Sequence, residues 1–193
     1  VAVTGVQTCA LPICVAGIVN RVRREGDHAL VTFVRKFDGL TLPLEVTTAE
    51  MKQAASQVPV DVRRAIKQAA RNIARVSAKQ VPKRLNLQVA PGVEVEQRVE
   101  PLARVGCYVP GGRFPLPSSL LMTAVPARVA GVRDVIAVCP RPEPVVMFAA
   151  LEAGVTHLFR MGGAHAVAAL AYGTATVPRV DKIVGPGNRY VAK

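Results

Sequence analysis

Tryptophan is absent from this chain of 193 residues, and aromatic residues make up only 4% of it. Proteins that bind single-stranded nucleic acid usually stack the bases on exposed aromatic rings, so this scarcity argues against that class. Acidic residues are also few, 13 against 25 lysines and arginines, which leaves a net charge of +12. Because both halves of the chain share this excess, an arginine-rich genome or a preference for acidic and phosphorylated ligands explains it more simply than a nucleic-acid-binding face does.

The sequence also lacks an apolar run of the ~20 residues that a membrane-spanning helix needs, and no basic segment precedes the apolar start as in a secretory signal. Its four cysteines (Cys9, Cys14, Cys107 and Cys139) form no CxxC pair and have no histidine at zinc-ligand spacing. We therefore expect no membrane partner, no disulfide framework, no metal-ligating residues, and free thiols in a reducing cytoplasm.

Residues 1–14 have neither helical nor strand periodicity, although they hold Cys9 and Cys14. The stretch Cys9-Ala-Leu-Pro-Ile resembles a translated sequencing adapter. We therefore predict that residues 1–14 are an artefact or a disordered tail, joined to the true chain near Val15.

Residues 15–82 have the apolar spacing of helices and are predicted to be the helical part of a first domain. We expect a helix from Val15, a second one capped by Asp27, a third that begins with the capping box Thr47–Glu50, and a fourth opened by Pro59. The fourth helix carries a row of cations four residues apart: Arg63, Lys67, Arg71, Arg75 and Lys79. Such a row favours a solvated surface or an acidic neighbour. It is also the basis of an alternative of another class, a basic nucleic-acid-binding protein.

Residues 83–193 consist of short apolar runs that lead into glycine or proline. Alternation on either side of Ala90-Pro91-Gly92 predicts a β-hairpin within residues 85–100. The next four runs do not alternate, as strands covered on both faces do not: Arg104–Val109, Asp134–Val138, His157–Arg160 and Lys182–Val184. Their spacing is that of strand–helix units. The fold class is therefore α/β, with a helical N-terminal segment followed by a doubly wound, mostly parallel, Rossmann-like sheet.

The turns after these four strands are the candidate site, because ligands of such sheets bind at the carboxyl ends of the strands. No turn contains G-x-G-x-x-G or a phosphate loop. Tyr108, just before a glycine pair, either stacks on a planar ring or belongs to the core. His165, in the first turn of a helix, either donates a hydrogen bond to a ligand as a neutral imidazole or has a capping or packing role. Asn188 either caps the last helix or reaches a ribose hydroxyl.

Several motifs together resemble histidinol dehydrogenase: Tyr108–Gly112, Pro115–Ser119, Gly162–Ala164 with Ala168–Gly173, and Val180–Asn188. The resemblance runs from about Val15 to Lys193 and rests on the order and spacing of the motifs. Its most specific part is Asp181–Asn188.

The resemblance implies a cytoplasmic, zinc- and NAD-dependent homodimer that oxidises L-histidinol to L-histidine in two steps, at the end of histidine biosynthesis. In the family, the zinc ligands and a Glu–His pair that moves protons lie beyond the matched region. We therefore expect no catalytic residue here, and an inactive amino-terminal fragment with an NAD-binding domain at residues 83–193. Tyr108 and Asn188 match family positions that contact NAD, and His165 stands where many members have glutamine, also a nucleotide contact. The alternative is a relative that oxidises another polar alcohol, such as a sulfonated diol.

Overall fold

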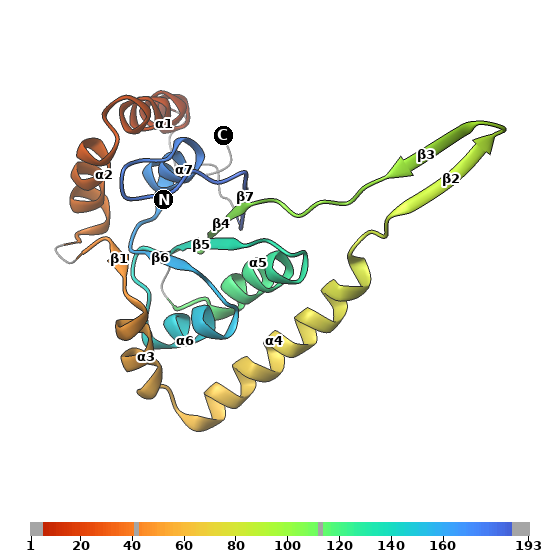
Figure 1. Cartoon of the computed structure of the whole chain (residues 1–193). Coiled ribbons are helices and arrows are strands. Elements are labelled where there is room, and N and C mark those ends of the chain that lie inside the picture. The colour runs from red at the N-terminus through yellow and green to blue at the C-terminus, as the bar shows by residue number, and fades with distance from the viewer. Residues whose placement is uncertain (1–5, 41–42, 112–113, 187–193) are drawn as a thin grey trace.

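The computed structural model describes residues 6–40, 43–111 and 114–186. A five-stranded sheet lies between two layers of helices, and a β-hairpin projects from this body (Figure 1). The helices are α1 (Val6–Glu25), α2 (Asp27–Phe33), the π-helix η1 (Val34–Asp38), α3 (Thr48–Ser56), α4 (Val60–Gln80), α5 (Pro117–Val129), α6 (Pro144–Glu152) and α7 (Gly163–Tyr172). The strands are β1 (Glu45–Val46), β2 (Leu85–Ala90), β3 (Val93–Gln97), β4 (Arg104–Tyr108), β5 (Asp134–Val138), β6 (His157–Phe159) and β7 (Lys182–Val184).

The strand order of the sheet is β1-β6-β5-β4-β7. Strands β4 to β7 are parallel to their neighbours, and β1 pairs antiparallel with β6 at one edge. The parallel strands begin at Arg104, Asp134, His157 and Lys182, as the sequence predicted. The predicted α/β fold class is therefore confirmed, while the short strand β1 was not foreseen.

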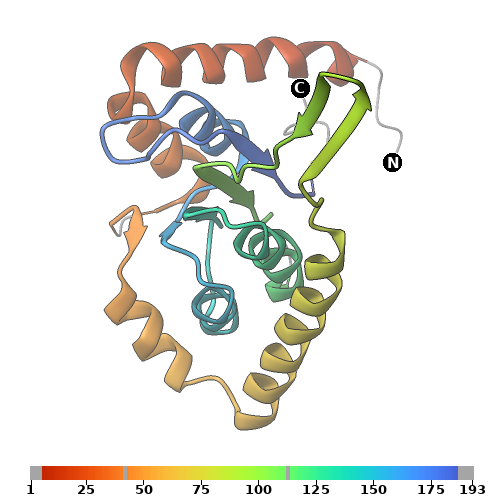
Figure 2. The same cartoon turned by 45° about the vertical axis from the view of Figure 1, so that its right-hand side comes forward.

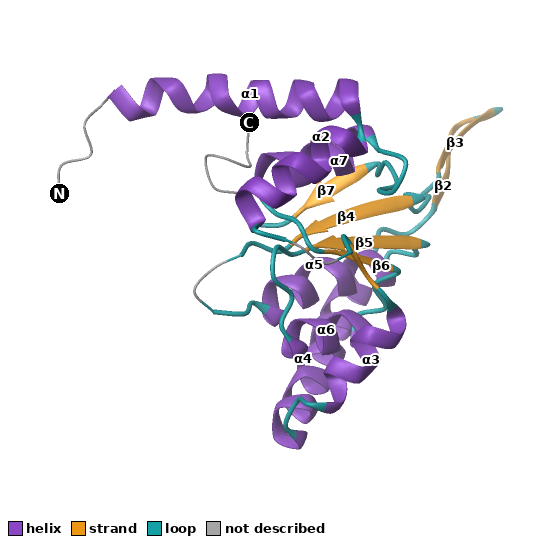
Figure 3. Ribbon diagram, turned by 90° about the vertical axis from the view of Figure 1, so that its left-hand side faces the viewer, coloured by secondary structure: helices purple, strands orange, loops and turns teal. Residues whose placement is uncertain are grey.

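Helices cover both faces of the sheet (Figure 3). The layer of α1, α2 and α7 packs on one face, and α3 to α6 pack on the other. Along β5, Val135 and Ala137 join the core beneath α5 and α6, whereas Ile136 and Val138 join the core beneath α7. Burial on both faces explains why these strands show no polar alternation.

The N-terminal helices differ from their predicted form in two places. Helix α1 begins at Val6 and so includes residues 6–14, which were expected to lie outside the helix. Extending an existing helix adds a hydrogen bond for each residue with a backbone N–H, although Pro12 within this stretch has none. Asp27 does not cap α2: the N-cap is Gly26, and the Asp27 carboxylate instead accepts hydrogen bonds from Thr176 N (3.0 Å) and Thr176 Oγ1 (2.8 Å). The origin of residues 1–14 and the division into domains stay predictions.

The next two helices begin where expected. Thr47 caps α3, since its hydroxyl accepts from Glu50 N at 3.1 Å, but the Glu50 carboxylate pairs with Arg160 instead of closing the capping box. Pro59 precedes α4.

In the cation row of α4, Lys67 Nζ lies 3.7 Å from Glu152 Oε1 of α6. Among the described residues, the other four cations of the row have no carboxylate within 4.0 Å, so most of the row is a solvated face.

Strands β2 and β3 form the predicted hairpin, which extends away from the sheet and its helices (Figures 1 and 2). Every residue of both strands is exposed. Alternation places five apolar side chains on one face, each 47–54% exposed: Leu85, Leu87, Val89, Val93 and Val95. We call this hairpin of β2 and β3 the arm. An isolated two-stranded ribbon is at best marginally stable in water, so the arm adds little to the stability of the body.

Within the described part of the chain, no helix has both the length and the apolar character needed to cross a bilayer.

Truncation of an arm residue is therefore expected to cost far less than truncation of a core residue of the same type. Leu87→Ala, in the arm, should lower the free energy of unfolding by less than about 0.5 kcal/mol, the usual range for surface positions. Leu158→Ala removes a fully buried side chain of β6 and should cost about 2–5 kcal/mol. Urea unfolding measures both; a cost of Leu87→Ala equal to that of Leu158→Ala would show that the arm is packed in solution.

Candidate functional site

The carboxyl ends of the four parallel strands lie level with one another along one edge of the sheet. Tyr108 is in register with Val138, and Val138 with Phe159. On the other side of β4, Cys107 is in register with Val184. The chain leaves β4 toward β5 on one side, and β7 lies on the other side, so a topological switch point falls between β4 and β7. Ligands of doubly wound sheets bind at such a point. We call this edge, formed by the turns that follow the four strands, the rim.

Pro140, which follows β5, packs between the turns that follow β4 and β6. A Cβ atom built on Gly111 would lie 2.9 Å from Pro140 Cγ, and one built on Gly162 would lie 2.3 Å from the same atom. Any residue larger than glycine at these two positions would force the turns apart. The predicted glycines of the first and third turns therefore meet at the rim through one proline ring.

The fourth turn is held against the first by a backbone contact. Gly185 has a φ of 151°, and a Cβ at this position would lie 2.3 Å from the Tyr108 carbonyl oxygen. Glycine is thus required here both for its conformation and for the close approach of two chain segments. This contact fixes the exit of β7 beside the end of β4.

Tyr108 connects the first turn to the third. Its side chain is only 6% exposed, and its hydroxyl accepts a hydrogen bond from Gly163 N at 3.1 Å. Burial raises the pKa of this phenol above its usual value. The hydroxyl therefore keeps its proton at neutral pH and retains one donor.

His165 lies beside the same turn, but its ring is directed into the protein. The residue is 2% exposed, and its Nε2 lies 2.8 Å from Asp38 Oδ2. Phe37 stacks on the imidazole with 5.9 Å between ring centroids. A Cβ built on Gly163 would lie 3.8 Å from the imidazole, so Tyr108 and His165 both contact this glycine. The structure thus brings these two predicted residues together, each already engaged within the chain.

The third predicted residue, Asn188, lies outside the described residues, as does the last helix that it was predicted to cap. The role of Tyr108, His165 and Asn188 as nucleotide contacts stays a prediction. Helix α5, after the first turn, has Leu116 as its N-cap, so Ser118 and Ser119 lie inside the helix.

The rim holds a hollow of about 230 Å³ between the turns that follow β4 and β5. Gly111, Leu116, Arg141 and Glu143 are among its lining residues. Cys139 also lines it, but burial raises the pKa of that thiol to about 11, so it is protonated and a poor nucleophile at neutral pH. Among the residues that the structure describes, no three His, Cys, Asp or Glu side chains gather as a metal site would require.

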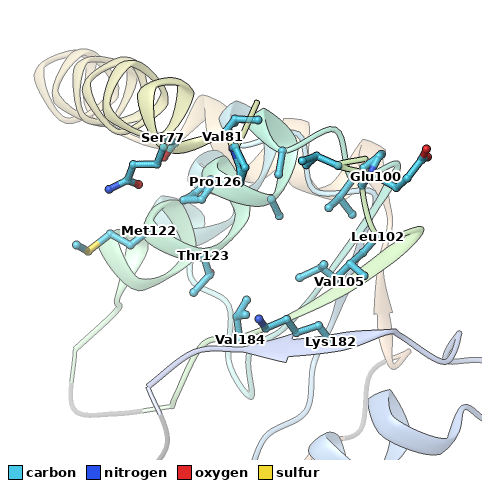
Figure 4. Close-up of a pocket in the computed structure, with 17 residues that line it drawn as sticks. Ser77, Val81, Glu100, Leu102, Val105, Met122, Thr123, Pro126, Lys182 and Val184 are labelled. Atoms are coloured by element: carbon cyan, nitrogen blue, oxygen red, sulfur yellow. The ribbon is translucent and has the colours of Figure 1, made fainter. Parts of the chain in front are cut away.

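Another hollow, of about 410 Å³, lies away from the rim (Figure 4). Its walls come from the end of α4, the base of the arm, α5, the start of β4 and both ends of β7, and they include Val81, Leu102, Met122 and Val184. The walls are mainly aliphatic. None of the described residues in the turns that follow the four strands lines this hollow, so it is separate from the rim where a doubly wound sheet binds its ligand.

The sequence and the structure of this chain are similar to those of a single protein family. The sequence model of the histidinol dehydrogenase family matches residues 7–193. The chain belongs to the histidinol dehydrogenase family. It is 51% identical over 185 residues to histidinol dehydrogenase of Symbiobacterium thermophilum and 49% identical over 186 residues to that of Geobacter sulfurreducens. These alignments cover 92% of this chain but 42% and 43% of the relatives. The crystal structure of histidinol dehydrogenase from Elizabethkingia anophelis superimposes with a TM-score of 0.88 at 32% identity, over 94% of this chain and 43% of that one.

The chain therefore spans less than half the length of the histidinol dehydrogenases that it matches. At the rim of this family member, sequence reasoning missed Asp38 and Pro140. The sequence Gly162-Gly163 offers α7 no capping side chain of its own, which leaves its first N–H groups for water or another segment, but this pattern does not single out Asp38. Pro140 gave no signal either, because its role depends on two turns that meet only in the folded chain.

Gly185 offers a direct test of the rim. Gly185→Ala should destabilise the chain by at least about 2 kcal/mol, because the new methyl group meets the Tyr108 carbonyl and the backbone is strained. Gly17→Ala, in the exposed part of α1 with nothing within 4 Å of the added Cβ, is the control and should stabilise by about 0.5–1 kcal/mol. Urea unfolding followed by circular dichroism measures both. Equal stability of the two variants would contradict the close contact of β7 with β4.

Proposed function

We propose that this chain is the nucleotide-binding part of an NAD-dependent histidinol dehydrogenase. Membership of the family over residues 7–193 carries this proposal. The level carboxyl ends of β4 to β7 support it, because a nicotinamide nucleotide needs one continuous rim of backbone donors and glycine turns. The nucleotide lies at the switch point between β4 and β7, near Tyr108, His165 and Asn188.

The reaction proposed for the whole protein is the oxidation of L-histidinol to L-histidine. Each of its two steps transfers a hydride to NAD⁺, and water supplies the second oxygen of the carboxylate. In this chain Tyr108 contributes a protonated hydroxyl beside Gly163, and the glycine turns let the backbone approach the cofactor. These residues bind and orient; none of them is proposed to transfer a proton to or from the substrate.

Zinc is proposed as the second cofactor of the whole protein, held by residues outside the matched region. The described residues do not offer a set of three ligands, so no step of the reaction is assigned to a metal here. A homodimer in the cytoplasm is the proposed form of the longer protein. A relative that oxidises another polar alcohol, such as a sulfonated diol, is the rival within the superfamily.

The cation row of α4 gives some support to the alternative function, a basic nucleic-acid-binding protein. Arg63, Arg64, Lys67 and Arg71 line a hollow of about 330 Å³ between α4 and α6. Phe148 also lines the hollow, but it is only 6% exposed and gives bases little surface on which to stack. The dehydrogenase assignment therefore has the stronger support.

We expect this chain to bind NAD⁺ weakly, with a dissociation constant well above a micromolar. A nucleotide site in a cleft needs two walls, and the chain supplies the one built on the rim. Titration calorimetry on the chain measures the affinity. Sub-micromolar binding would contradict the view that the site is incomplete.

A protein extended to the length of its relatives should oxidise L-histidinol with NAD⁺ as acceptor, and this chain alone should not. Turnover is followed by the absorbance of NADH. A chelator should abolish it and added zinc should restore it. Turnover of a sulfonated diol in place of histidinol would identify the rival enzyme, and no turnover of either would overturn the proposed function.

A further inference from the structure

Asp38 joins the N-terminal helical segment to the rim. It is the last residue of η1, and Gly39 follows it in the left-handed conformation (φ 65°, ψ 24°). Its Oδ2 atom lies 2.8 Å from His165 Nε2 and accepts a hydrogen bond from Gly162 N at 3.3 Å. The side chains of Asp38 and His165 are 9% and 3% exposed. The contact is thus nearly closed to water, although the two residues are far apart in sequence.

These contacts serve as the N-terminal cap of α7. Its N-cap residue, Gly162, has no side chain to accept the first backbone N–H groups of the helix. The Gly162 N–H donates to Asp38 instead, and the Gly163 N–H donates to the Tyr108 hydroxyl. A carboxylate is well suited to this place, because the N-terminus of a helix carries partial positive charge.

Two adjacent residues of the π-helix contact the imidazole of His165. Phe37 stacks on His165 while the adjacent Asp38 contacts Nε2 of the same ring. A π-turn is wider than an α-turn and is frequent at functional sites. The first turn of α7 is therefore fixed in position by charge, hydrogen bonding and ring packing from one short segment.

The turn that Asp38 caps is also the turn on which the rim depends. Gly162 packs against Pro140, and Gly163 contacts Tyr108. A shift of this turn would move the ends of β4, β5 and β6 relative to one another. We propose that Asp38 is a positioning residue for nucleotide binding, which holds the first turn of α7 in the form that the rim requires. This inference rests on the proposed function.

Asp27 provides a matched control. It is a carboxylate of the same helical segment, and it also accepts a backbone N–H from the region of α7, that of Thr176 at 3.0 Å. Thr176 follows the C-terminal end of α7, so this contact lies away from the rim. Loss of Asp27 should loosen the loop after α7 and leave the first turn in place.

The test compares Asp38→Ala, Asp38→Asn and Asp27→Ala. In this chain, Asp38→Ala should speed amide hydrogen exchange in residues 160–165, and Asp27→Ala should speed it in residues 173–178 instead. In a protein extended to the length of the relatives, Asp38→Ala should weaken NAD⁺ binding by about tenfold, as loss of a hydrogen bond to a charged group does. Asp38→Asn keeps an acceptor for Gly162 N and should recover part of the loss. Asp27→Ala should leave the affinity within about twofold of the wild-type value, even if its melting temperature falls as much as that of Asp38→Ala.

Unchanged exchange at residues 160–165 in Asp38→Ala would overturn the inference. So would NAD⁺ affinity that falls equally in Asp38→Ala and Asp27→Ala, since that result indicates a general loss of stability. Failure of the extended wild-type protein to bind NAD⁺ would overturn the proposed function, and with it the purpose assigned to Asp38. If the extended wild-type protein binds NAD⁺ and Asp38→Ala binds it equally well, only the role of Asp38 would be overturned.

Discussion

The contact of Pro140 with Gly111 and Gly162 sets how closely the turns of the rim can approach one another. A side chain at either glycine would come within 2.9 Å of the proline ring. Gly185 imposes the same condition on the other side of β4, where it lies against the Tyr108 carbonyl. The rim is thus built by backbone segments that touch.

The helical segment does more than cover the sheet. Through Asp38 and Asp27 it reaches both ends of α7, the helix between β6 and β7. Through Glu50 it also reaches Arg160, which is 5% exposed just after β6 and is paired there with a carboxylate. A buried charge is tolerated when it is paired and hydrogen-bonded. The N-terminal helices and the sheet are therefore connected by polar contacts close to the candidate site as well as by apolar packing.

The sequence predicted the parts of this fold that depend on local pattern. The four parallel strands, the hairpin, the start of α4 and the cap at Thr47 follow from hydrophobic spacing and from capping chemistry. Asp27 illustrates what could not be predicted: its position suits a cap of its own helix, but its carboxylate binds Thr176. At the site, the meeting of Tyr108 and His165 at Gly163 follows from parallel topology. The inward direction of the His165 ring depends on Asp38, whose position is set by the tertiary fold.

The arm has a consequence for the handling of the chain. Among the described residues, each of its two strands pairs only with the other, so the outer sides carry rows of peptide groups without a strand partner there, next to half-exposed leucine and valine. Open strand edges of this kind act as templates for further strands. When the chain is concentrated by itself, intermolecular β-sheet growth is expected to start at the arm while the α/β body stays folded. Charged substitutions on the apolar face of the arm would slow such aggregation without reaching the rim.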